Sequence, residues 1–88
     1  MIKIVLADAQ YLVRIGLRSL LSATKDFKIV GEAVNTEELL KLSEEMHPDV
    51  VIFDYNSSNN FVQEDMIQVR KVSPSTRFLV ISADESKS

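Results

Sequence analysis

The sequence has no cysteine and no tryptophan, and it has only two glycines and two prolines among 88 residues. Without cysteine there is no disulfide framework or thiolate metal site, and a reducing compartment suits the chain, so we expect a cytoplasmic protein. No apolar run approaches the roughly 20 residues that a membrane span requires. Met1 leads straight into an expected strand, so we expect no signal peptide and no membrane association. The few glycines and prolines argue against a disordered chain.

The length and the charge narrow the class of protein further. Eighty-eight residues, 45% of them hydrophobic, allow one globular domain. With 10 basic and 13 acidic residues the net charge is −3, which argues against nucleic acid as a direct partner of this segment.

Short apolar runs alternate along the chain with stretches of helical periodicity. We expect strands at residues 2–7, 27–34, 50–53 and 77–82, and helices at residues 10–22, 36–47 and 62–73. This βαβαβαβ order predicts an α/β fold with a parallel sheet and helices on both faces. The second strand is the more polar one and is therefore expected at a sheet edge.

The helical periodicity also predicts which side chains face the sheet. In the first helix Val13, Leu17, Leu20 and Leu21 share one face, and we attribute Gly16 to close packing on the sheet. In the third helix the expected buried face is formed by Val62, Met66, Val69 and Val72. Asn35 is expected to cap the second helix.

The fourth expected strand carries an apolar run that would be adhesive if left bare. It needs cover on both faces and a neighbouring strand. We therefore expect either further chain beyond residue 88 or self-association through this strand.

Polar residues end three of the expected strands: Asp8, Asp54 and Ser82. Any one of them alone would more often be structural. Together they would meet at the carboxyl edge of the sheet, where open α/β folds bind ligands. Two carboxylates there favour a hard cation such as Mg²⁺, and a hydroxyl could bond a phosphoryl oxygen.

In this order and spacing, four segments carry a family resemblance: residues 4–8, 12–21, 47–54 and 80–83. They resemble the receiver domain of bacterial two-component response regulators, and most closely receivers that precede a LuxR/NarL-type DNA-binding helix-turn-helix. The resemblance implies a flavodoxin-like three-layer α/β/α fold that lacks the last strand and helices of the usual domain. Residues 1–88 would then form roughly the first three-quarters of a receiver domain.

The resemblance also implies roles for individual residues. Asp54 matches the phosphoacceptor, and Mg²⁺ would be held by Asp8, Asp54 and the backbone carbonyl of Asn56. Ser82 matches the switch hydroxyl that moves toward the phosphoryl group, and Ala83 matches the small residue beside it. The implied partner is a sensor histidine kinase or a phosphotransfer protein. DNA would be contacted only through an output domain outside this chain.

The sequence also departs from the family pattern. Ala9 stands where the family has its second metal-binding acid, and this loss should cost at least the ~10–100-fold in metal affinity typical of a lost supporting group. Gln10 offers only a neutral oxygen nearby. The loop at residues 57–60 lacks the usual Met-Pro and glycine, and the family's lysine lies on a fifth strand that this chain does not contain.

Three interpretations follow. The first is a phosphoacceptor receiver, and the second is a degenerate receiver that keeps the interaction surfaces but signals without phosphate. The third is an unrelated α/β module, either a flavodoxin-like enzyme or a nucleotide binder. No glycine-rich phosphate loop and no Ser-His-Asp or Cys-His set supports the third, so we expect no enzyme.

Overall fold

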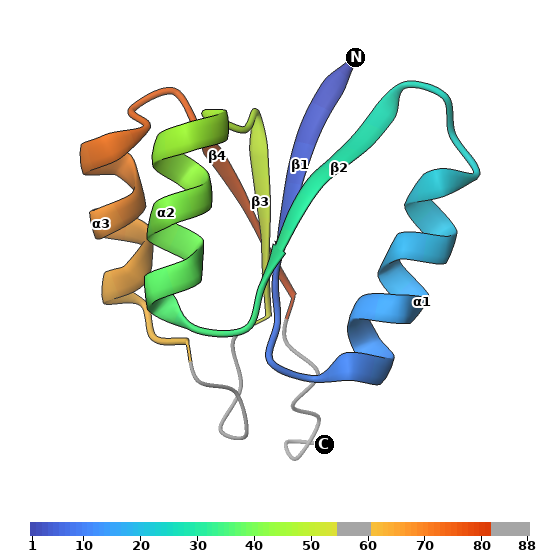
Figure 1. Cartoon of the computed structure of the whole chain (residues 1–88), viewed down its shortest axis with the longest axis horizontal. Coiled ribbons are helices and arrows are strands. Elements are labelled where there is room, and N and C mark those ends of the chain that lie inside the picture. Colours follow the sequence, from blue (N-terminus) through green and yellow to red (C-terminus); the bar gives the residue numbers. More distant parts are fainter. Residues whose placement is uncertain (55–60, 82–88) are drawn as a thin grey trace.

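The computed structural model describes residues 1–54 and 61–81, and for Asp54 the main chain alone. Seven elements follow one another along the chain (Figure 1): β1 (Ile2–Ala7), α1 (Tyr11–Ser22), β2 (Phe27–Ala33), α2 (Thr36–Met46), β3 (Val50–Asp54), α3 (Glu64–Val72) and β4 (Arg77–Ile81). The predicted βαβαβαβ order is confirmed.

The four strands form one parallel sheet in the order β2-β1-β3-β4. The polar strand β2 lies at an edge, as predicted, and the apolar strands β1 and β3 lie inside. Figure 1 shows α1 on one face of the sheet and α2 with α3 on the other. Over the described residues, this three-layer arrangement has the order of the first four strands of the flavodoxin-like fold.

The core is divided by the sheet because successive strand residues point to opposite faces. Ile4, Leu6 and Ile52 point to the side of α1, where Leu17 and Leu21 pack on them. The larger cluster lies under α2 and α3 and consists of Val5, Ala7, Ala33, Leu39, Val51, Phe53, Phe61 and Val69.

Helix α1 is less buried than its periodicity predicted. None of its residues is fully buried, and the side chain of Leu20 is 73% exposed. A Cβ added at Gly16 would meet no atom within 4 Å, so the attribution of this glycine to close packing was wrong. The helix touches the sheet along a narrow line through Leu17 and Leu21, which lie one turn apart.

The third helix begins two residues later than predicted, and the buried residue before it is Phe61 in place of Val62. Val62 is 52% exposed, whereas Phe61 is buried and packs edge to face on Phe53, with 5.6 Å between the ring centroids. Because α3 begins only at Glu64, helical periodicity does not govern residue 62. The buried Asp65 accepts hydrogen bonds from the Val62 amide at 2.9 Å and from Thr36 Oγ1 at 3.0 Å, and so joins the starts of α2 and α3.

Helix α2 begins with the predicted cap. Asn35 Oδ1 accepts a hydrogen bond from the Glu38 amide at 2.9 Å, and Glu38 Oε1 accepts one from the Val34 amide at 3.0 Å. The first bond satisfies an amide of the first helical turn, and the second satisfies the amide of the residue just before the cap.

None of the helices within residues 1–54 and 61–81 has both the length and the apolar character that a membrane span requires.

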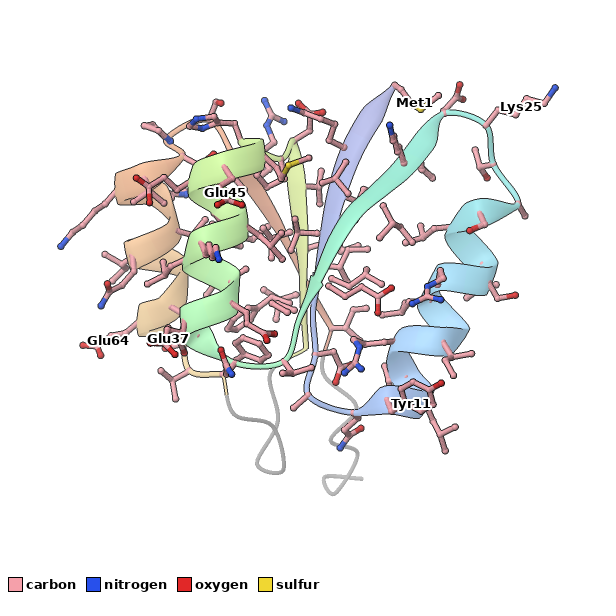
Figure 2. The ribbon with its side chains drawn as sticks, viewed as in Figure 1. Met1, Tyr11, Lys25, Glu37, Glu45 and Glu64 are labelled. Carbon is pink, nitrogen blue, oxygen red and sulfur yellow. The ribbon has the colours of Figure 1, made fainter. Side chains whose placement is uncertain are left out.

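Both acidic and apolar residues are exposed on the outer surface. Figure 2 shows Glu37, Glu45 and Glu64 at the exterior of α2 and α3. The side chains of Leu79 and Val80 on β4 are 54% and 48% exposed, because within the described residues no strand lies beyond β4.

Candidate functional site

The carboxyl ends of β1, β3 and β4 lie at one edge of the sheet. The strand register pairs Ala7 with Phe53 and Asp54 with Ile81. Asp8 follows β1 directly, so residues 8 and 54 occupy neighbouring positions at this edge. Asp54 was expected just past its strand but is the last residue of β3, because the pairing with β4 extends to it. Asn56 and Ser82 lie outside the described residues.

Asp8 is held in place through its main chain and its side chain. It is 1% exposed, and its amide donates to the carbonyl oxygen of Ala33 on β2 at 3.1 Å. Its carboxylate oxygen Oδ1 accepts a hydrogen bond from the Gln10 amide at 2.8 Å. Such a bond to the amide two residues on closes a tight turn, so the loop from β1 to α1 is ordered around this acid.

The structure describes the carboxylate of Asp8 at this edge and the main chain of Asp54 beside it. Acids on adjacent strand ends suit a hard cation, and Mg²⁺ commonly uses one or two carboxylates and keeps several waters. The half-buried Ala9 offers only a methyl group in the turn after Asp8. In the described part of the chain, no group of three or more His, Cys, Asp or Glu side chains is placed to hold a metal ion. Asp8 and the position of Asp54 are therefore the acids at this edge that could take part in holding Mg²⁺.

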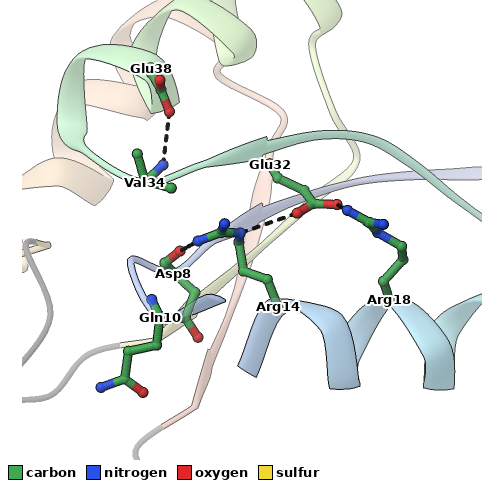
Figure 3. A network of polar contacts seen from close by, with 7 residues as sticks. All are labelled: Asp8, Gln10, Arg14, Arg18, Glu32, Val34 and Glu38. Atoms are coloured by element: carbon green, nitrogen blue, oxygen red, sulfur yellow. Dashed lines mark hydrogen bonds and ion pairs between the residues drawn. The ribbon is translucent and has the colours of Figure 1, made fainter. Parts of the chain in front are cut away.

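A charged network beside Asp8 was missed by the sequence analysis (Figure 3). Arg14 Nη1 donates to the carbonyl oxygen of Asp8 at 2.8 Å, and Arg14 Nε donates to Glu32 Oε1 at 3.2 Å. Arg18 donates to Glu32 Oε2 from both Nε and Nη2. The two arginines stand four residues apart on one face of α1, and this spacing was visible in the sequence. Their acidic partner was not, because it depends on the position of β2 beside the helix.

The strand order and the acids at the ends of the two inner strands define a flavodoxin-like domain of the receiver class. The chain superposes with a TM-score of 0.83 and 31% identity on the signal receiver domain of the response regulator NarL from Mycobacterium tuberculosis, covering 96% of this chain and 68% of that one. It therefore belongs to the response regulator receiver family, of the NarL and LuxR type.

Longer proteins also contain segments that are similar to this chain. The nitrate/nitrite response regulator protein NarL of Escherichia coli K12 is 34% identical over 79 residues, which cover 90% of this chain. The chain spans 37% of the length of that regulator. A protein-glutamate methylesterase/protein-glutamine glutaminase of Methanosarcina mazei is 38% identical over 56 residues, but these make up only 16% of that enzyme. No family model matches the chain.

Proposed function

We propose that this chain is a phosphoacceptor receiver and that Asp54 takes the phosphoryl group. The observation that carries the proposal is the adjacency of β1 and β3, which brings Asp8 and the position of Asp54 to the same carboxyl edge in a domain of the receiver family. Phosphoryl transfer needs a nucleophile and a cation at one point, and two acids at one edge provide for both.

The proposed donor is a phosphohistidine on a sensor histidine kinase or a phosphotransfer protein. A carboxylate oxygen of Asp54 attacks phosphorus, the new P–O bond forms, and the P–N bond of the donor breaks. The electron pair of that bond goes to the imidazole nitrogen, which takes a proton from solvent. Asp8, Asp54 and the carbonyl of Asn56 would hold Mg²⁺, which when bound offsets the negative charge of the transferring group.

The proposed consequence is a change in an output domain outside this chain. The hydroxyl of Ser82 would bond the phosphoryl group, and Ala83 would leave room for it. Because the chain covers 68% of the receiver from Mycobacterium tuberculosis, we propose that residues 1–88 form the N-terminal part of the domain and that a further strand covers β4. We propose that this output domain binds DNA and regulates transcription, as the resemblance to LuxR/NarL-type regulators implies.

One observation favours a second function, that of a degenerate receiver acting as a phosphate-independent interaction or dimerisation module. Ala9 follows Asp8 directly, at the point where a second acid would strengthen cation binding. A site with one carboxylate fewer binds Mg²⁺ more weakly, and phosphoryl transfer slows with it.

The two functions are separated by intact-mass measurement of the full-length protein incubated with a small acyl phosphate and Mg²⁺. We expect the addition of one phosphoryl group, and its loss in Asp54→Asn. Asp49→Asn is the matched control, because Asp49 lies at the opposite end of β3 and bonds the Lys3 amide at 2.8 Å. The absence of any adduct at saturating donor and Mg²⁺ would favour the degenerate receiver.

A further inference from the structure

The peptide group between Asp8 and Ala9 sets the direction of both residues at the proposed metal site. A peptide is planar, so fixing its carbonyl oxygen also fixes the directions in which the two flanking Cα atoms extend. This oxygen accepts a hydrogen bond from Arg14 Nη1 at 2.8 Å. The donor comes from the first turns of α1 and reaches back over the turn that carries both residues (Figure 3).

Arg14 is itself fixed on two further sides. Its Nε donates to Glu32 on the edge strand β2, and its guanidinium lies 5.7 Å from the centre of the Tyr11 ring. The side chains of Arg14 and Glu32 are only 14% and 20% exposed, whereas that of Arg18 is 56% exposed. A half-buried ion pair holds its geometry better than an exposed one, because water competes less for the same donors.

Glu32 offsets the positive charges of Arg14 and Arg18. Two guanidinium groups four residues apart on one helix face repel each other. The carboxylate of Glu32 lies between them, with Oε1 accepting from Arg14 and Oε2 from Arg18. The negative charge of Glu32 therefore allows Arg14 to remain beside the Asp8 carbonyl. Nη1 of Arg14 bonds Asp8 and Nε bonds Glu32.

We propose that Arg14, anchored by Glu32, is a positioning residue of the Mg²⁺ site. It acts through the Asp8–Ala9 peptide, which it holds in the orientation that presents Asp8 and residue 9 to the cation. The inference rests on the proposed function, since it requires a cation at Asp8. The hydrogen bonds among Arg14, Arg18 and Glu32 then position a metal ligand in addition to joining α1 to β2.

The test is a double-mutant cycle in the full-length protein that combines Ala9→Asp with Arg14→Ala. The Mg²⁺ dissociation constant is measured from amide chemical shifts during titration with Mg²⁺ alone, without phosphodonor. We expect Ala9→Asp to tighten binding about 10-fold or more, and Arg14→Ala to weaken binding about 10-fold. Arg14→Ala should also remove most of the gain from Ala9→Asp, because the new carboxylate is no longer directed at the cation.

Arg18→Ala is the matched control. This substitution also breaks an ion pair with Glu32. Arg14, and not Arg18, bonds the Asp8 carbonyl, so we expect the Mg²⁺ dissociation constant of Arg18→Ala to change less than about twofold. Arg14→Lys should not restore binding, because an ammonium group cannot reproduce the fork that reaches Asp8 and Glu32 together. If Arg14→Ala does not fold, Glu32→Gln replaces it. This variant keeps the arginine but removes its anchoring charge, and it should weaken Mg²⁺ binding as well.

Equal effects of Arg14→Ala and Arg18→Ala, or a full gain from Ala9→Asp without Arg14, would overturn the inference and leave the proposed function intact. Unchanged Mg²⁺ affinity in Ala9→Asp with Arg14 present would show that the metal site itself is misplaced. In that case the inference would be wrong, while the phosphoacceptor function would still be decided by the intact-mass measurement with Asp54→Asn.

Discussion

At the scale of single residues, the two glycines have opposite surroundings. Gly16 lies within α1 with open space around its Cα, whereas a Cβ at Gly31 on β2 would lie 2.7 Å from Cδ2 and 2.9 Å from Cδ1 of Leu42. Helix α2 therefore approaches β2 closely at Gly31. No packing contact requires a glycine at position 16, so its greater conformational freedom in the unfolded chain only destabilises the helix.

Alanine substitution should separate the two positions. We expect Gly16→Ala to raise the free energy of unfolding by about 0.5–1 kcal/mol, because alanine restricts the unfolded chain and favours the helix. Gly31→Ala should bring a smaller gain or none, because the two terminal methyl groups of Leu42 must shift to make room. Urea denaturation followed by circular dichroism measures both. An equal gain for the two variants would contradict this description of the packing.

At the scale of elements, β1 and β3 could be predicted because residues 4–7 and 50–53 are uninterrupted apolar runs of the kind that is buried inside a sheet. The start of α2 could be predicted from Asn35, whose side chain acts locally. The exposure of Leu20 and the burial of Phe61 could not be predicted, because they depend on where a helix sits on the sheet and where it begins. For the same reason the sequence indicated Asp8 but not the contact between Arg14 and Glu32.

Strand β4 has one free edge within the described residues, and its run from Phe78 to Ile81 contains no charge or proline. Such edges pair with other strands. We expect the 88-residue chain on its own to self-associate, as measured by sedimentation equilibrium. Leu79→Lys should shift it toward the monomer, because a charged side chain then lies beside the free edge.

The control is Leu20→Lys, which places the same charge at a more exposed leucine on α1, away from β4. A chain that stays monomeric at high concentration would contradict the role given to β4. So would equal dissociation by the two lysine variants.

At the scale of the whole molecule, the two faces of the sheet are covered unequally, and the candidate site lies at the rim between them. On the side of α2 and α3 the core is extensive, and Asp65 fixes the segment that leads into α3. On the other side α1 makes fewer contacts with the sheet, but it carries Arg14, which reaches the Asp8 carbonyl. Elements from both faces thus converge on the carboxyl edge.

We propose that a divalent cation binds at this edge, between the ends of β1 and β3. The most direct measurement uses Mn²⁺, which takes similar oxygen ligands and broadens nearby amide signals in the full-length protein. We predict that the amides adjoining Asp8 and Asp54 broaden first, while those of Lys3 and Asp49 at the opposite edge stay sharp. Broadening centred on the amino ends of the strands, or on the exposed acids of α2, would contradict a cation site between Asp8 and Asp54.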